Sequence, residues 1–298
     1  MPSANGILLI DKPEGMPSAS VVRVVKKTLA EDKVGHLGTL DPFASGLLPL
    51  CLGVGTKIAQ FLMTERKAYI GTIRLGIETD TLDGTGTITR TAAVPFYPPE
   101  ALQDLQQQFS GDYWQTPPMY SALKRQGVPL YKLARRGIEV EREPRKVTIE
   151  RFSLEPLGND TLKFSLVCSK GTYVRSLAAD LGVVLGCGAH LATLRRTEFG
   201  PFSIENAVSL AQLSDCLERG SLSVFSLVQA LQHYRTLRLE PHAVARLRRG
   251  QQDILRDLPS VMAKDELAQL VSPDGELVAM VQENQGQWKL IRVFLTLH

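Results

Sequence analysis

The chain has 298 residues, of which 44% are hydrophobic, and a formal net charge of +3 at pH 7, which suits a sizeable core arranged as one large domain and a small one. No apolar run approaches the roughly 18 residues of a membrane span, and the four cysteines form no CxxC pair, which argues against a zinc site or a disulfide framework. We therefore expect a cytoplasmic protein without a signal peptide.

The first predicted elements are a short strand and a helix. Gly6 to Ile10 is an apolar run typical of a buried strand, and Asp11-Lys12-Pro13 ends it. Ser18 is expected to cap a helix that extends to about Leu29. The apolar stripe of this helix consists of Val21, Val22, Val25 and Leu29.

The stretch from Gly35 to Pro49, GHLGTLDPFASGLLP, holds a single carboxylate, Asp41, among apolar residues. Its glycines and prolines predict turn backbone rather than a helix or a long strand. The neighbouring leucines and Phe43 need burial, so Asp41 is expected on a rigid loop, where a buried charge is costly unless it is paired. Two interpretations stay open: a carboxylate kept for chemistry, or an Asx-turn in which Asp41 bonds the backbone two residues on.

Lys67 to Gly76 alternates in polarity and predicts a half-buried strand. Tyr69 opens this strand, where its ring either projects into a cleft or stays half buried. The following segment, 77–86, is rich in turn residues and carries three acids, among them Asp83. It lacks the pattern of a calcium loop and its closing glutamate, so we expect no metal there.

The positive charge is concentrated in one segment. It follows a helix predicted at Pro98 to Phe109. Residues 119–146 hold eight basic and three acidic side chains, a net charge of +5 that leaves −2 for the rest of the chain. Tyrosines interleave with these cations, and charges with rings suit phosphates and unstacked bases. RNA binding and a solvated surface helix are both open from the residues alone. The candidate RNA contacts are Lys124, Arg125, Lys132, Arg135 and Arg136.

A strand at Leu162 to Cys168, a helix at Val174 to Leu185 and a returning strand within residues 186–202 are predicted next. Tyr173 and Arg175 lie at the strand-to-helix junction, a usual place for site residues. Arg175 is either a surface residue or the partner that a buried Asp41 requires. In the second case it would lower the pKa of Asp41 by about 1–3 from roughly 3.9.

The end of the chain is mixed in pattern. Residues 203–231 are predicted to be helical and to close the large domain. Pro241 opens a small helix that ends at Gly250, and the turn Pro273-Asp274-Gly275 separates two strands, near Leu277–Val281 and Trp288–Phe294. The predicted domains are 1–232, which includes the basic insertion 119–146, and 233–298.

Six segments resemble, in order and spacing, the TruB family of pseudouridine synthases, which isomerise the uridine at position 55 in the T-arm loop of tRNA. They are LLIDKPEGMPS (8–18), VGHLGTLDPFASGLLPLCLGVGTK (34–57), KAYIGTIRLGIETDTLDGTG (67–86), PPMYSALKRQGVPLYKLARRGIEV (117–140), CSKGTYVRSLAADLG (168–182) and GAHLATLRR (188–196). The insertion looks like that of the stand-alone bacterial enzymes, because the guide-RNA-dependent relatives lack it. The resemblance implies an α/β mixed (α+β) fold with a central, mostly antiparallel sheet, and the C-terminal region resembles the small β-rich PUA domain that binds RNA.

The resemblance also implies roles for individual residues. Asp41 is the catalytic carboxylate, Arg175 pairs with it and orients it, and Tyr69 stacks on the flipped uracil and helps to remove the proton from C5. Lys12 and Pro13 resemble a structural Lys-Pro element. The remaining site residues are His36, which contacts the RNA loop near the vacated base position, Tyr173 and Leu194, which line the pocket, and Asp83, which supports the site.

The implied reaction needs no redox step and no cofactor. An ionised Asp41 can attack C1′, attack C6 or remove a sugar proton, and the sequence leaves these three open. The expected partner is the T-arm of tRNA, bound by a monomer without a guide RNA or an obligate protein partner. A competing hypothesis is a tRNA-binding or RNA-folding protein without catalysis. We also predict that residues 119–140 are mobile without RNA, because their charge favours solvent.

Overall fold

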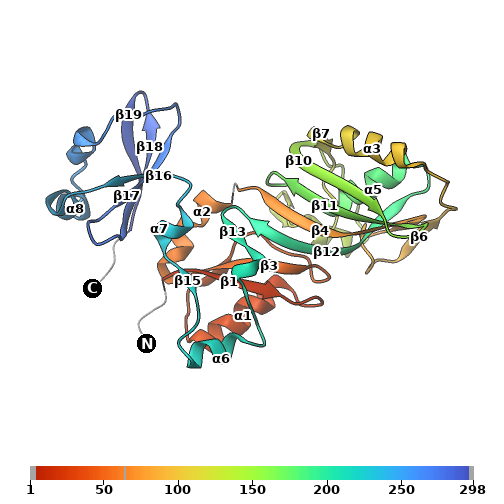
Figure 1. Cartoon of the computed structure of the whole chain (residues 1–298), viewed down its shortest axis with the longest axis horizontal. Helices are drawn as coiled ribbons and strands as arrows, with labels where there is room; N and C mark the ends of the chain where they lie inside the picture. Colours follow the sequence, from red (N-terminus) through yellow and green to blue (C-terminus); the bar gives the residue numbers. More distant parts are fainter. Residues whose placement is uncertain (1–4, 64, 295–298) are drawn as a thin grey trace.

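The computed structural model in Figure 1 describes residues 5–63 and 65–294, and an eleven-stranded sheet runs through its larger part. The strands of this sheet are β1 (Gly6–Lys12), β2 (Val34–His36), β3 (Ser45–Leu52), β4 (Lys67–Leu75), β7 (Gly111–Gln115), β10 (Arg145–Pro156), β11 (Thr161–Cys168), β12 (Ala189–Phe199), β13 (Phe202–Ser203), β14 (Val208–Ser209) and β15 (Val224–Phe225). Their order is β14-β1-β3-β12-β4-β11-β10-β7, while β2 pairs with β3, β13 with β12 and β15 with β1.

The sheet is mostly antiparallel, as predicted. Among the described strands of this sheet, only the pairs β1–β14 and β3–β12 are parallel. The β3–β12 contact is short, because only Ser45 and Gly46 of β3 pair with β12. This contact is the seam between two halves of the sheet, and both β3 and β4 adjoin β12 there. The ends of these strands therefore come together at the middle of the molecule.

The α-helices of the described residues are α1 (Ser18–Leu29), α2 (Ala59–Leu62), α3 (Pro99–Gln108), α4 (Leu130–Ala134), α5 (Val174–Val184), α6 (Leu213–Glu218), α7 (Leu227–Ala230) and α8 (Pro241–Arg248). Of these, α1, α3 and α5 follow from the apolar periodicity of the sequence and pack on the large sheet. The buried residues Val21 and Val25 of α1, Leu105 of α3 and Leu181 of α5 belong to one core with strand residues such as Phe164. None of the helices within the described ranges is long and apolar enough to cross a membrane.

The C-terminal region forms a second sheet at one end of the molecule (Figure 1). Its four strands are β16 (Arg235–Arg238), β17 (Leu267–Val271), β18 (Leu277–Asn284) and β19 (Gln287–Val293), in that order. Leu277 and Met280 of this sheet share a core with Ile7 and Phe202 of the eleven-stranded sheet. The likeness to a PUA domain and the boundary between residues 232 and 233 stay predictions, and the predicted ends at 1–4 and 295–298 lie outside the described residues.

Several local predictions are wrong. Residues 45–52 form strand β3, although the stretch 35–49 was expected to be turn backbone, because Pro49 fits into the strand opposite Leu9 and its carbonyl still accepts the Leu37 N–H at 2.9 Å. Residues 203–231 are not one helical pattern but the short helices α6 and α7 between short strands. The turn at 273–275 joins β17 to β18, and the two strands expected around it are neighbours across residues 285–286.

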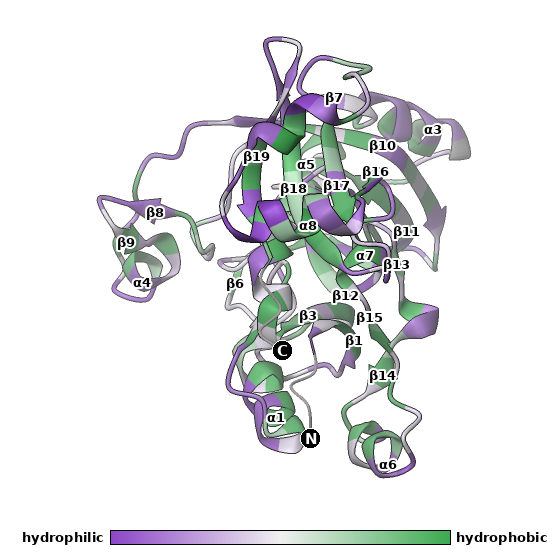
Figure 2. Ribbon diagram, turned by 90° about the vertical axis from the view of Figure 1, so that its left-hand side faces the viewer, coloured by the Kyte–Doolittle hydropathy of each residue, from purple (hydrophilic) through white to green (hydrophobic). Residues whose placement is uncertain are grey.

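The basic segment holds little helix, so it is not the surface helix that was one of the two interpretations left open. Between residues 119 and 140 only α4 is helical, after a small hairpin of β8 (Lys124–Arg125) and β9 (Val128–Pro129). In Figure 2 this hairpin and α4 project away from the rest of the molecule on two long connections. The projecting unit is too small to bury a core of its own, and its buried side chain is Leu130.

Candidate active site

Asp41 lies on the loop between β2 and β3, and the peptide groups on both sides of it are held by hydrogen bonds. The Ser18 hydroxyl accepts from the Leu40 N–H and donates to the Leu40 carbonyl, both at 2.9 Å. Ser18 is thus not the predicted helix cap, since Pro17 occupies that position and no side chain caps α1. The buried Lys12 ammonium donates to the Pro42 carbonyl at 3.2 Å. These bonds fix the main chain that carries the carboxylate.

Arg196 of β12 also holds this loop. The Arg196 side chain is only 1% exposed, and its guanidinium donates to the Leu47 carbonyl at 2.7 Å and to the Gly38 carbonyl at 3.0 Å. Gly38 has φ +67°, and a Cβ there would lie 2.9 Å from the ring of Phe199. Arg196 therefore joins the start of the Asp41 loop to strand β3, which follows the loop, and a side chain at position 38 would break this packing.

Asp41 is paired with Arg175. The Arg175 Nε lies 2.9 Å from Asp41 Oδ2, and the Arg175 side chain is buried whereas 38% of the Asp41 side chain is exposed. The turn at Asp41 is closed by the backbone, because the Ala44 N–H donates to the Asp41 carbonyl at 3.1 Å. The carboxylate is thus engaged by a guanidinium and still open to a substrate, which favours the chemical interpretation over the Asx-turn.

Arg175 is itself fixed by two carbonyl acceptors and by a second ion pair. Its Nη2 donates to the Tyr120 carbonyl at 2.8 Å and its Nη1 to the Thr81 carbonyl at 3.0 Å. Nη1 also lies 3.8 Å from Oδ2 of Asp83, which is 4% exposed. Asp83 Oδ1 accepts from the Thr81 hydroxyl and from the N–H and hydroxyl of Thr85. One guanidinium therefore holds two carboxylates and two carbonyls in a single geometry.

The predicted lowering of the pKa of Asp41 is wrong. Burial raises the pKa of Asp41 above its ordinary 3.8. Arg175 acts in the opposite direction, and the negative charge of Asp83 adds to the rise. The cause of the difference is desolvation, which outweighs the ion pair.

Tyr69 is the third predicted catalytic residue and lies on β4, opposite Arg196 of β12. Its ring is buried, and its hydroxyl accepts from the Arg196 guanidinium. Burial raises the pKa of Tyr69 to about 12, while Arg196 acts to lower it. Because Arg196 bonds both the Tyr69 hydroxyl and the Asp41 loop, one side chain sets where the tyrosine stands relative to the carboxylate.

The predicted substrate-binding residues lie around this centre. Leu194 is a buried residue of β12 and pairs with Gly71 of β4. Tyr173 precedes α5, and burial raises the pKa of its hydroxyl. His36 ends β2, and burial with the nearby Arg196 lowers the pKa of its imidazole below 6.5. The lowered pKa favours the neutral imidazole at pH 7.

The candidate RNA contacts of the insertion are all exposed: Lys124, Arg125, Lys132, Arg135 and Arg136. The root of the insertion touches the centre directly, through the Tyr120 carbonyl that Arg175 bonds. Sequence reasoning assigned no role to Arg196 and did not consider Gln115, the residue that closes β7 next to this root. The sequence shows Arg196 only as a cation within a predicted strand, and nothing in that pattern predicts that the side chain is buried.

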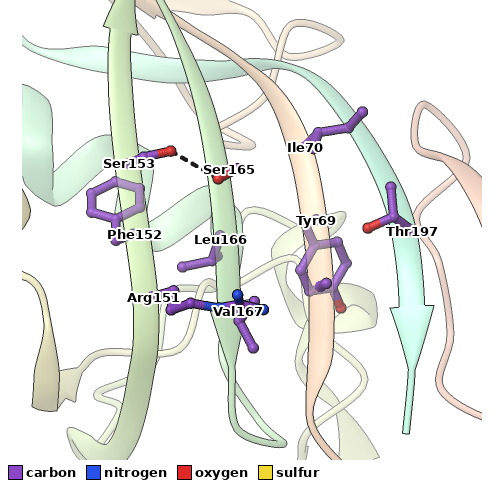
Figure 3. A pocket seen from close by; sticks show the side chains of 10 residues that line it. Tyr69, Ile70, Arg151, Phe152, Ser153, Ser165, Leu166, Val167 and Thr197 are labelled. Carbon is purple, nitrogen blue, oxygen red and sulfur yellow. Dashed lines mark hydrogen bonds between the residues drawn. The ribbon is translucent and has the colours of Figure 1, made fainter. Parts of the chain in front are cut away.

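A cavity of about 340 Å³ opens on the sheet, and Tyr69 is one of the residues that line it (Figure 3). It is lined by strands β4, β10, β11 and β12, with Ile70, Arg151, Ser153, Ser165 and Thr197 among its residues. Asp41 and Arg175 do not line it, so it is not the candidate active site. Within the described ranges, no cluster of three or more His, Cys, Asp or Glu side chains could hold a metal ion.

Comparison with known proteins gives matches along most of the chain. The family model described as TruB family pseudouridylate synthase (N terminal domain) matches residues 26–174, and that described as tRNA pseudouridylate synthase B C-terminal domain matches residues 175–232. A protein of Geobacter sulfurreducens named tRNA pseudouridine synthase B is 42% identical over 97% of this chain and 99% of the relative. One of the same name from Francisella philomiragia is 47% identical over 76% of each chain.

Solved structures show the same fold. The crystal structure of a Cbf5-Nop10-Gar1 complex contains a chain that is 26% identical, with a TM-score of 0.76 over 97% of this chain and 85% of that one. A chain of the archaeal box H/ACA sRNP Nop10-Cbf5 complex is similar in fold, with a TM-score of 0.73, 24% identity and coverage of 97% and 86%.

Proposed function

Because this chain belongs to the TruB family of pseudouridylate synthases and forms pseudouridine in tRNA, we propose that its target is the uridine at position 55 in the T-arm loop and that Asp41 is the catalytic carboxylate. One observation carries the assignment of the residue. Asp41 lies 2.9 Å from a buried guanidinium, on a loop held at both ends, and 38% of its side chain remains exposed. A protein that only bound RNA would gain nothing from a fixed acid facing phosphates, since the acid would repel them.

The reaction is an isomerisation. The N1–C1′ bond of the nucleotide breaks, the uracil turns, and a C5–C1′ bond forms; C5 loses its proton and N1 gains one, so atoms and charge balance. An ionised Asp41 can serve by attack at C1′, by attack at C6 or by removal of a sugar proton. All three need the carboxylate form, which the Arg175 guanidinium favours against the effect of burial.

Tyr69 is proposed to hold the detached uracil against its ring. Its pKa of about 12 makes the free phenolate rare at pH 7, roughly one part in 10⁵. That pKa value already includes the effect of the Arg196 guanidinium, which acts to lower the pKa, so we propose holding the base as the main role of Tyr69 and removal of the C5 proton as a secondary one. Leu194 and Tyr173 supply apolar surface that excludes water from the cleaved base.

Binding is proposed to rest on the projecting insertion. Extruding the target base costs a few kcal/mol, and contacts between the exposed cations of residues 119–146 and T-arm phosphates offset that cost. We propose a cytoplasmic monomer that binds tRNA without a guide RNA or a partner protein, and residues 233–298 as a second RNA-contacting domain. The self-contained centre, with Asp41, Tyr69, Arg175 and their supports on one chain, supports this arrangement.

The test is release of tritium from tRNA labelled at C5 of uridine, with the wild type and Asp41→Asn compared. Release by the wild type, with none by a variant that still binds tRNA, is the expected result. A transcript with cytidine at position 55 should give no release if that uridine is the target. If both proteins release label equally, Asp41 is not the catalytic residue; if the wild type binds tRNA and releases nothing, the chain is an RNA-binding protein without this catalysis.

A further inference from the structure

Gln115 is a buried polar residue for which the mechanism above has no use. It is the last residue of β7 at the edge of the sheet and is 2% exposed. Its side-chain amide donates from Nε2 to the Tyr173 carbonyl at 3.0 Å and accepts the Tyr173 N–H on Oε1 at 2.7 Å. Because a backbone N–H only donates and a carbonyl only accepts, the orientation of this amide is fixed.

Tyr173 is the residue on which helix α5 begins, and no side chain caps that helix. The orientation of its first turn therefore depends on contacts from elsewhere in the fold. Gln115 supplies two of them by holding both peptide groups of Tyr173, much as a neighbouring strand would. Arg175 follows two residues later in the same turn, so the clamp acts close to the guanidinium that pairs with Asp41.

The clamp is one of several bonds along the same short segment. The Ser176 hydroxyl donates to the Thr116 carbonyl at 3.0 Å, and Arg175 Nη2 donates to the Tyr120 carbonyl at 2.8 Å. Residues 115–120 therefore lie along the start of α5 and are bonded to it at positions 173, 175 and 176. The same segment leads directly into the projecting insertion that carries the exposed cations.

We propose that Gln115 is a positioning residue that registers the root of the RNA-binding insertion against the start of α5, so that a correctly seated insertion places Arg175 on Asp41. The inference rests on the proposed roles of Asp41 and Arg175. Gln115 is buried and its side chain bonds the Tyr173 backbone. Its effect on the rate therefore passes through Tyr173 to Arg175. The positions of the insertion and of the Arg175–Asp41 pair are then coupled. Binding of tRNA to the insertion influences the Asp41 carboxylate through residues 115–120.

The chain offers a matched control in Gln106 of α3. Its side-chain amide also donates to a backbone carbonyl, that of Leu102 at 3.0 Å, and accepts a backbone N–H, that of Leu154 at 3.0 Å. Its bond to Leu102 lies within α3, and its bond to Leu154 joins that helix to β10 of the same sheet, away from Arg175. Gln106→Met and Gln115→Met each remove one donated and one accepted bond to the backbone, and methionine keeps the length of the side chain.

The experiment measures single-turnover pseudouridine formation with enzyme in excess, together with tRNA affinity and the pH dependence of the rate. Gln115→Met is expected to lower the rate about 10–100-fold, the scale of a misplacement near 1 Å, with unchanged tRNA affinity. Its acid limb should move to higher pH, because a displaced Arg175 no longer opposes the effect of burial on Asp41. Gln106→Met should keep the wild-type rate and pH profile.

Equal rates and equal pH profiles for the two methionine variants would overturn the proposal. If Gln115→Met does not fold, Gln115→Glu replaces it, since a carboxylate still accepts the Tyr173 N–H but cannot donate to the Tyr173 carbonyl; a wild-type rate in that variant would also overturn it. A wild type whose activity depends on Asp41, with no effect at Gln115, would refute this inference alone. A wild type without activity would refute both it and the proposed function.

Discussion

Replacing Arg175 with methionine is expected to destabilise the protein chiefly through Asp83 rather than through Asp41. The two acids differ in their access to water: the Asp83 side chain is 6% exposed and the Asp41 side chain 38%. Without the guanidinium, Asp41 can be hydrated, whereas Asp83 stays buried with an uncompensated charge. Removing one partner of a buried ion pair costs about 3–5 kcal/mol, and we expect Arg175→Met to lower the free energy of unfolding by that amount.

Second substitutions separate the two carboxylates. Asp83→Asn in the Arg175→Met background removes the buried charge and retains an oxygen for the bonds from Thr81 and Thr85, so it should restore about 2–3 kcal/mol. Asp41→Asn in that background should restore less than about 1 kcal/mol, as for an exposed pair. Neither double variant should regain tritium release, because each lacks the Arg175–Asp41 pair.

Urea denaturation followed by tryptophan fluorescence measures these changes, and the slope of unfolding free energy against urea concentration serves as the control. A constant slope shows that the denatured state is unchanged. If Asp41→Asn restores as much stability as Asp83→Asn, or more, the reasoning from burial is refuted.

Three further predictions concern acid–base behaviour, RNA binding and thiol reactivity. Since burial raises the pKa of Asp41 above 3.8, single-turnover rates should fall as the pH decreases through that raised value, and a limb at or below pH 3.8 would contradict it. Lys132→Ala and Arg136→Ala should each weaken tRNA binding and reduce the slope of log affinity against log salt by about 1; an unchanged slope would exclude phosphate contact. Of the four cysteines, only Cys216 is not buried, so one thiol should react promptly with a thiol reagent in the native protein and all four after unfolding; prompt reaction of two or more would contradict this.

Much of the fold could be predicted because many strands and helices show their pattern of buried residues within a single stretch of sequence. Strands β4 and β11 alternate in polarity, and helices α1, α3 and α5 repeat their apolar residues at helical spacing, so their positions are confirmed. Strand β3 was missed because Pro49 suggests a break, although a strand tolerates a residue without an N–H where its carbonyl still accepts. The prediction of a helical pattern at residues 203–231 was wrong because short helices and strands that pack against different partners can imitate one helical repeat.

Some features of the candidate site could also be predicted from the sequence, and others could not. The need of a buried Asp41 for a cation was predictable from chemistry, and Arg175 was a suitable partner by its place at a strand-to-helix junction. Arg196 and Gln115 were not, because their acceptors are backbone groups of Gly38, Leu47 and Tyr173, and a sequence carries no sign of which carbonyl lies near which side chain. The sign of the pKa shift of Asp41 was wrong for a related reason: the ion pair was foreseen, but not the extent of desolvation.

The pairing of β1 has a consequence for synthesis on the ribosome. Its Ile7 pairs with Phe225 of β15, and Ile10 pairs with Val208 of β14, so one of the first strands to be made waits for some of the last of the large domain. At about 5–20 residues per second, roughly 10–40 s separate the emergence of these partners. During that interval the nascent chain exposes an apolar strand edge, and Arg196 has not yet arrived to hold the Asp41 loop. We therefore expect activity to appear in one step, after residue 225 has emerged from the ribosome, rather than to increase gradually as earlier segments emerge.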